Sequence, residues 1–282
     1  MSVFNPLPVE PIFFSWRGHH IAGYRDGAGP KLLLVHSINA AASAFEMRGP
    51  FTGLRDSFHV QALDLLGYGR SDRPARSYMA NDYIELIGHM LQLMGAGTAV
   101  VAGSLSAAFA VKVAVRWPSL VRALVLICPT GIAQLAQPPG PPNWAAYRLL
   151  QGSLGEGLFR ALTTRAGTRF FLERQAYAQP ESITPETLDG FYLTTRPAGA
   201  RYAPLCFVTG LLNCNIAADF AELTQPVLLV WGREATTTPL PQADAFLARN
   251  ARAQLKSVAD TSMLVQDERP AEFNAIVRDF LL

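Results

Sequence analysis

The sequence is poor in charge and in cysteine, and each shortage excludes a class of protein. Only 16% of the 282 residues are charged and the formal net charge is +2, which excludes a strongly basic surface for nucleic acid. The three cysteines, Cys128, Cys206 and Cys214, are too few and too scattered for a disulfide framework or a zinc site. We therefore expect a protein of a reducing compartment that uses no metal and no cofactor.

Long apolar runs and a leader segment are also missing. No apolar run reaches the roughly 20 residues that cross a bilayer, and residues 1–16 show no basic segment followed by an apolar core. Half of the chain is nevertheless hydrophobic, which is enough to bury a large core. The sequence predicts a cytoplasmic protein without a membrane span, whose partner is a small apolar molecule.

Short apolar runs alternate with helical patterns over most of the chain. Such runs are typical of strands buried on both faces, and they are followed by segments with apolar residues three or four apart. The apolar runs occupy residues 31–37, 60–69, 98–103, 123–129 and 226–232. This order predicts right-handed crossovers and an α/β fold with a doubly wound, mostly parallel sheet.

The alternation stops in one long segment. Residues 133–222 begin with a proline-rich stretch and continue through aromatic-rich helical fragments without a buried-strand pattern. We interpret this segment as a helical cap, and residues 1–132 together with 223–282 as the α/β core.

Polar motifs follow three of the expected strands, where ligands bind in open parallel sheets. They are His36-Ser37-Ile38-Asn39, the turn Asp64-Leu65-Leu66-Gly67-Tyr68-Gly69-Arg70-Ser71, and Ala102-Gly103-Ser104-Leu105-Ser106. In this order the motifs resemble those of the α/β-hydrolase family, whose members carry a nucleophile elbow after a central strand. The resemblance implies eight strands and a helical cap. It also implies a nucleophile at Ser104 and an oxyanion hole from the backbone N–H groups of Leu105 and Ile38.

Two serines compete for the elbow. The family pattern G-x-S-x-G is altered here, because the flanking positions hold Ala102 and Ser106, which are small but are not glycine. The family typically has a proline at the end of the following helix, about four turns on, and Pro118 lies fourteen residues after Ser104, so the resemblance favours Ser104 over Ser106. A purely structural alternative remains open for Ser104, since serine is also a good helix N-cap.

The resemblance does not extend to the usual triad. The family's acid position holds Ala235, with Glu234 one residue early, and the alternative acid position after the sixth strand holds Cys128 and Pro129. The family's base position holds Met263, and none of the five histidines lies beyond residue 89. Methionine cannot accept a proton, so the usual general base is missing.

Three functions fit this combination. The first is a non-hydrolytic enzyme that binds a small apolar molecule. Its polar groups would be Ser37, Asn39, Ser104, Ser106 and Ser262. The second is a ligand-binding or accessory protein that kept the fold but not the chemistry. The third is a serine esterase with a base from an unusual place, for which His36 is the candidate, although a histidine there more often supports the loop from beneath.

Overall fold

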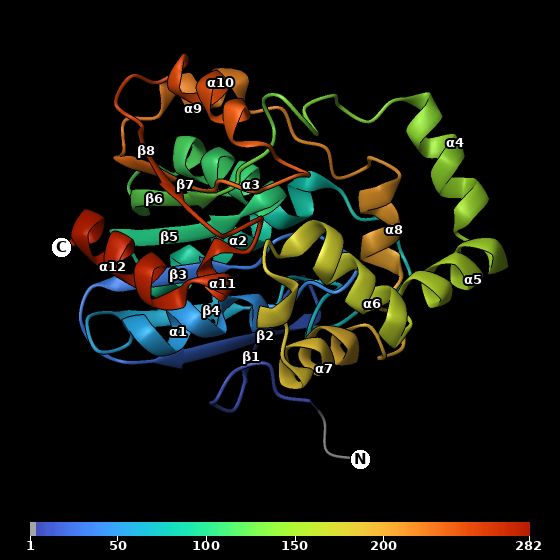
Figure 1. Ribbon diagram of the computed structural model, residues 1–282. Coiled ribbons are helices and arrows are strands. Elements are labelled where there is room, and N and C mark those ends of the chain that lie inside the picture. Colours follow the sequence, from blue (N-terminus) through green and yellow to red (C-terminus); the bar gives the residue numbers. More distant parts are fainter. Residues whose placement is uncertain (1–3) are drawn as a thin grey trace.

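The computed structural model describes residues 4–282 as an eight-stranded sheet with helices on both faces and a helical insertion beside it (Figure 1). The strand order is β1-β2-β4-β3-β5-β6-β7-β8, with the β1–β2 and β2–β4 pairs antiparallel and the remaining pairs parallel. The strands are β1 Ile12–Trp16, β2 His19–Asp26, β3 Lys31–Val35, β4 His59–Leu63, β5 Thr98–Gly103, β6 Val121–Ile127, β7 Val227–Gly232 and β8 Gln254–Val258. The predicted doubly wound, mostly parallel sheet is confirmed.

The centre of the sheet is the best-buried part of the molecule. Every residue of β5 and of β7 is buried, as expected for parallel strands covered by helices on both faces. The strands β3, β5 and β6 lie side by side and end at the same edge of the sheet. The loops that follow them therefore meet at one place.

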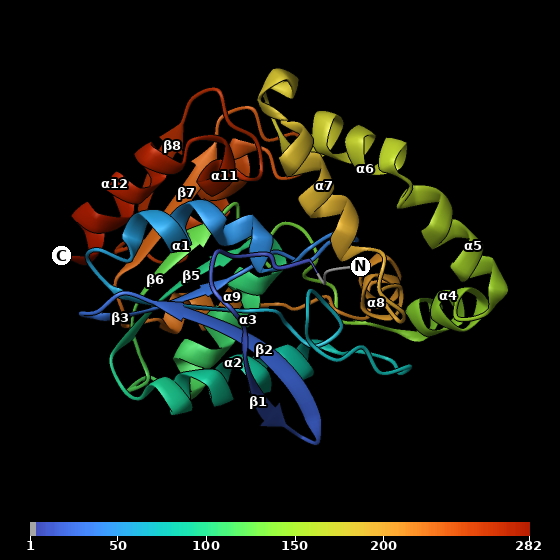
Figure 2. The ribbon, with the colours of Figure 1, turned by 90° about the horizontal axis from the view of Figure 1, so that it is seen from below.

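Helices cover both faces of this sheet (Figure 2). On one face, α1 packs against α12, and on the other α2 packs against α3. The core helices are α1 Arg48–Leu54, α2 Ala80–Met94, α3 Ser104–Arg116, α10 Ala243–Leu247, α11 Val265–Glu268 and α12 Pro270–Leu281, and a 3-10 turn, η1 Ala44–Met47, precedes α1. None of the helices in residues 4–282 has both the length and the apolar character needed to cross a bilayer.

The insertion is helical and contains no strand. Its helices are α4 Pro141–Leu150, α5 Ser153–Leu162, α6 Arg165–Phe171, α7 Pro185–Thr194 and α8 Tyr202–Val208. The helix α9, Ala217–Glu222, follows them and packs against α3 of the core. In Figures 1 and 2 the helices α4 to α8 project to one side of the sheet.

The apolar patterns in the sequence located the central strands correctly. They did not locate the ends of these strands precisely, and they did not reveal the edge strand β1. The pattern at residues 60–69 contains a strand only to Leu63, and β3 ends at Val35, so His36 and Ser37 belong to the following loop. The pattern did not mark β1, because Ile12 and Phe13 of this edge strand are exposed. An edge strand has no continuous buried run to reveal it.

Candidate functional site

Ser104 lies at the sharp turn between β5 and α3. Its φ is +51°, a left-handed conformation, whereas Gly103 before it is extended. Such a backbone in a residue other than glycine stores strain of about 1–3 kcal/mol. Ser106 is fully buried within α3, and its hydroxyl has no hydrogen-bond partner among the described residues. The turn thus presents Ser104 at the carboxyl edge of the sheet, and its role as a nucleophile stays a prediction.

The loop after β3 lies directly beside this turn. A Cβ atom built on Gly103 would stand 3.5 Å from the Cβ atom of Ser37 and 3.6 Å from its backbone nitrogen. Ile38 follows in the same loop and is buried. The first N–H groups of a helix have no intrahelical acceptor, which leaves the N–H of Leu105 available to a ligand. The two segments that the sequence predicts to form an oxyanion hole are therefore neighbours.

His36 uses both of its ring nitrogens to hold backbone groups. The Leu65 N–H donates to Nε2 at 3.0 Å, so the ring proton is on Nδ1, which donates to the Ser37 carbonyl oxygen at 2.6 Å. Burial lowers the pKa of His36 and keeps it neutral. A ring engaged in this way supports the loop and has no free nitrogen for the Ser104 hydroxyl.

The other histidines lie away from the elbow. His19 and His20 are on β2, which is separated from β5 by β4 and β3, or about 14 Å at the usual strand spacing. His59 begins β4, at the opposite edge of the sheet, and His89 is on α2 with its ring 6.2 Å from that of Phe14. None of these side chains is placed to serve as a base for Ser104.

The loops that carry Ala235 and Met263, which the resemblance assigns to the acid and base positions, lie together. The Cys128 thiol contacts the Ser262 carbonyl oxygen at 3.9 Å, and the Met263 sulfur contacts the Thr237 hydroxyl. Ala235 is buried in the same group of loops. Burial raises the pKa of the Cys128 thiol to about 12, so it is no thiolate. This side of the site offers a thiol, a thioether and hydroxyl groups.

Glu234 does not take over the acid position. Its side chain belongs to an exposed residue, and its carboxylate accepts the Thr261 N–H at 3.1 Å. The neighbouring Glu234 N–H donates to the Thr261 carbonyl oxygen at 3.1 Å. These reciprocal bonds tie two loops together.

Sequence reasoning missed a buried carboxylate behind the loop after β3. Glu46 of η1 is completely buried and accepts hydrogen bonds from Ser37 and Asn39. Burial raises its pKa to about 7. The signal available in the sequence was a single acid within the apolar run AFEM.

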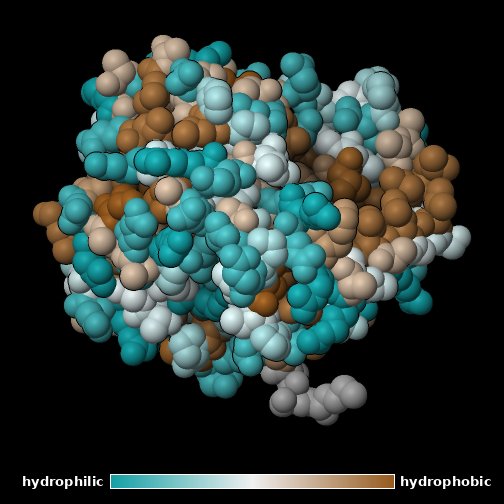
Figure 3. Space-filling model, viewed as in Figure 1, coloured by the Kyte–Doolittle hydropathy of each residue, from teal (hydrophilic) through white to brown (hydrophobic). Residues whose placement is uncertain are grey.

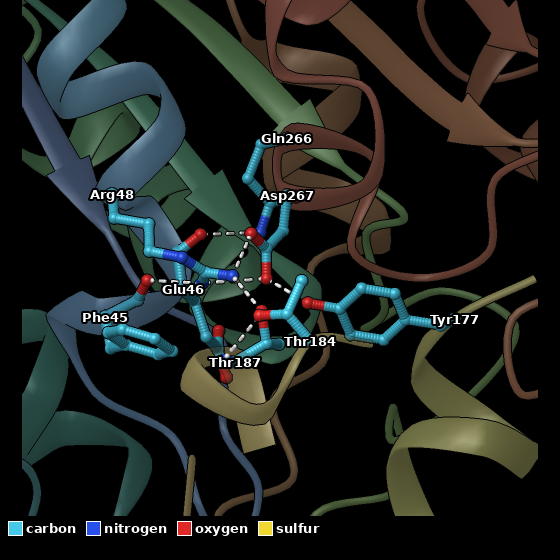
Figure 4. Close-up of polar contacts among 8 residues, drawn as sticks. All are labelled: Phe45, Glu46, Arg48, Tyr177, Thr184, Thr187, Gln266 and Asp267. Carbon is cyan, nitrogen blue, oxygen red and sulfur yellow. Dashed lines mark hydrogen bonds and ion pairs between the residues drawn. The ribbon is translucent and has the colours of Figure 1, made fainter. Parts of the chain in front are cut away.

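A second missed cluster joins the core to the cap (Figure 4). Arg48 of α1 forms a two-pronged ion pair with Asp267 of α11, at 2.7 and 2.8 Å, and also donates to the Thr187 hydroxyl of α7 at 3.2 Å. The Tyr177 hydroxyl, which comes from the insertion, donates to the same Asp267 carboxylate. These contacts hold the cap segments against α1 and α11.

Glu268 adds to this attachment. Its carboxylate accepts the Ser262 N–H and the Ala178 N–H, both at 2.6 Å. Ser262 precedes Met263 in the loop after β8, and Ala178 belongs to the insertion. Burial raises the pKa of Glu268 to about 7. One carboxylate thus fixes both the base-position loop and a cap segment.

An apolar slot opens between the cap and the loop after β3. Its lining includes Ala40, which follows Asn39, and side chains of α5 and α8: Leu158, Phe159, Leu162, Leu205 and Val208. Figure 3 shows apolar side chains gathered on this side of the cap, where Figure 1 draws α4, α5 and α8. The slot touches the loop after β3 at Ala40, and its lining does not include Ser104. In residues 4–282 no group of three or more His, Cys, Asp or Glu side chains is arranged to hold a metal ion.

Comparison with known proteins agrees with this architecture. The family model described as "Alpha/beta hydrolase family" matches residues 32–276. A relative from Mesorhizobium japonicum, 2-(acetamidomethylene)succinate hydrolase, is 37% identical over 233 residues, covering 80% of this chain and 77% of its own. The 2-hydroxymuconate semialdehyde hydrolase of Pseudomonas sp. (strain CF600) is 28% identical and covers 90% of this chain and 88% of its own.

A solved structure shows the same fold over nearly the whole chain. The structure of a serine hydrolase involved in carbazole degradation superposes with a TM-score of 0.80 at 18% identity, covering 96% of this chain and 98% of its own. The strand order, the turn at Ser104 and the matched family model lead to one conclusion. The chain belongs to the α/β-hydrolase family.

Proposed function

We propose that this chain is a serine-dependent hydrolase of small carbonyl compounds with an apolar part, slow because no imidazole assists Ser104. The observation that carries the proposal is the backbone of Ser104, with a φ of +51°. A serine that only caps a helix has an extended backbone and needs no such strain. The strained turn therefore supports a use for the Ser104 hydroxyl.

The chemistry then follows from the groups around the turn. The substrate carbonyl oxygen accepts hydrogen bonds from the Leu105 and Ile38 N–H groups, which polarise the bond. The Ser104 oxygen adds to the carbonyl carbon while hydroxide takes its proton. The leaving group departs with a proton from water, and a second water releases the acid from Ser104. Such a hole retains about 10³–10⁴-fold catalysis over water when triad members are missing.

The apolar slot supports the substrate class. Apart from Arg201, the slot is lined by apolar and small residues, and it reaches Ala40 beside the loop of Ile38. The two relatives described above are hydrolases of small molecules whose names include a succinate and a semialdehyde. A small carbonyl compound whose apolar part occupies the slot fits both facts.

A second candidate is the non-hydrolytic enzyme, which would isomerise, cyclise or eliminate from a molecule bound at the same place. Met263 favours it, because a thioether at the base position cannot take a proton from Ser104. A non-catalytic binding protein would have the same slot and no dependence of any reaction on Ser104.

Hydrolysis of p-nitrophenyl esters with short and medium acyl chains separates these candidates. We expect Ser104→Ala to abolish the reaction and the control Ser106→Ala to retain it. Without an imidazole, kcat/KM should keep rising about tenfold per pH unit above neutrality, because only hydroxide removes the proton. Hydrolysis that survives Ser104→Ala would refute the proposal.

A fluorophosphonate probe gives an independent check. Such probes need an activated hydroxyl, so labelling of Ser104 should be slow. Rapid stoichiometric labelling, or a plateau of kcat/KM near neutral pH, would reveal a base that this proposal denies. Saturable ligand binding without any ester hydrolysis would favour the second candidate or the binding protein.

A further inference from the structure

In the loop after β3, Ser37 is held by a buried carboxylate. The Ser37 N–H donates to Glu46 Oε2 at 2.8 Å, and the Ser37 hydroxyl donates to Oε1 at 3.0 Å. The Asn39 side-chain amide donates to Oε1 at 2.8 Å and to the Ser37 hydroxyl oxygen at 2.9 Å. Glycine at position 37 would supply the backbone N–H alone. Serine adds a second donor to the same carboxylate.

These bonds act on the peptide that carries the Ile38 N–H. The Ser37 N–H is held by Glu46, and the Ser37 carbonyl oxygen is held by the His36 ring at 2.6 Å. In a trans peptide the carbonyl and the next N–H point in opposite directions. Because the Ser37 carbonyl points at His36, the Ile38 N–H points away from it. Both backbone polar groups of Ser37 are thus restrained. Its nitrogen lies 3.6 Å from the position that a Cβ atom on Gly103 would occupy, so this restrained peptide is beside the turn at Ser104.

We propose that Glu46, acting through Ser37 and Asn39, is a positioning residue that fixes the direction of the Ile38 N–H for binding a substrate carbonyl. The proposal rests on the proposed function, because it concerns the same carbonyl site. Preorganised donors are effective in catalysis only when their orientation is fixed before the substrate arrives. Asn39 adds to this restraint, since its side-chain oxygen accepts the Ala41 N–H at 2.8 Å.

The restraint is sensitive to pH. Two titratable groups from other elements interact electrostatically with Glu46: Asp267 of α11 and Tyr68 after β4. Arg48 pairs with Asp267, and no cation is hydrogen-bonded to Glu46 in residues 4–282. Burial raises the pKa of Glu46 to about 7, while its bonds from Ser37 and Asn39 lower it. As the pH falls through about 7 the carboxyl gains a proton and loses acceptor capacity, so the loop loosens.

The first test observes the loop without any substrate. The amide proton shifts of Ser37 and Ile38 in an NMR spectrum should titrate with a midpoint near pH 7 in the wild type. They should not titrate in Glu46→Gln, whereas the control Glu186→Gln, a change in an exposed residue of α7, should leave the titration unchanged. Amide shifts that ignore pH in the wild type, or that titrate equally in Glu46→Gln, would overturn the proposal.

The second test measures kcat and KM for the p-nitrophenyl ester. Removing one oxyanion-hole donor costs about 10²–10³ in kcat, so a misdirected donor in Glu46→Gln should lower kcat roughly tenfold or more with little change in KM. Ser37→Gly keeps Glu46 and the backbone N–H and removes the two hydrogen bonds of the Ser37 hydroxyl, so it should fold and show a smaller loss. Wild-type kcat in both variants would contradict the positioning role. If the wild type hydrolyses no ester, the proposed function fails, and the amide titration still decides what Glu46 does to the loop.

Discussion

Replacing Asp267 with Asn should break its ion pair with Arg48, one of the contacts between the cap and the core. The resulting decrease in the free energy of unfolding depends on how deeply these two side chains are buried. Only 3% of the Asp267 side chain is exposed, against 26% for Arg48. Removing one partner of a fully buried pair costs about 3–5 kcal/mol, whereas surface pairs contribute at most about 1 kcal/mol. Water reaches Arg48 and can solvate the charge left behind. We therefore expect a loss of about 2–3 kcal/mol in the free energy of unfolding.

The raised pKa of Asp267 favours the lower end of the expected loss in unfolding free energy. Burial raises this pKa even though Arg48 lies beside the carboxylate, so the ion pair only partly offsets the cost of burying the charge. Asparagine keeps one oxygen for the Tyr177 hydroxyl and leaves Arg48 without a counter-charge. The destabilisation should come mainly from that uncompensated guanidinium.

Urea denaturation at neutral pH measures this loss directly. Arg48→Met and the double variant complete a double-mutant cycle, in which the coupling between the two sites should account for most of the loss. Arg169→Met is the matched control, because the side chains of its pair with Glu173 are 47% and 33% exposed and the pair should contribute less than about 0.5 kcal/mol. A loss below about 1 kcal/mol for Asp267→Asn, or additive single effects, would refute the argument.

Three further results are expected. Gly69→Ala should destabilise the fold by more than about 2 kcal/mol in the same denaturation assay. The backbone φ at this position is +49°, and the new Cβ atom would stand within 2.2 Å of the Asp64 carboxylate. Wild-type stability of this variant would refute the expected clash. Burial raises the folded-state pKa of Glu268 to about 7, so ionising this carboxyl lowers the free energy of unfolding as the pH rises toward that value. The difference in unfolding free energy between the wild type and Glu268→Gln should therefore shrink between about pH 4.5 and 7. A difference that stays constant with pH would contradict this. The double variant Met263→His with Ala235→Asp should hydrolyse p-nitrophenyl esters faster than the wild type. If a crystal structure shows the new imidazole against the Ser104 hydroxyl and activity has not increased, Ser104 has only a structural role.

The sequence by itself determined where along the chain the central strands lie and where the turn at Ser104 falls. Both depend on local properties, since a strand buried on both faces needs a continuous apolar run and a tight strand-to-helix turn needs small neighbours such as Ala102. The absence of a histidine after His89 was equally visible, and the prediction that the usual base is missing rests on it. The edge strand β1 left no such mark, because its side chains are partly exposed.

Only the tertiary structure decided which buried polar groups meet. Arg48 and Asp267 are 219 positions apart in the chain, and no spacing relates them. Glu46 lies nine positions from Ser37, yet their contact depends on how η1 packs behind the loop after β3. The state of His36 was likewise set by the backbone groups of Leu65 and Ser37. Most buried polar atoms find a partner, and the identity of that partner is a property of the folded chain, because it depends on which segments the sheet brings together.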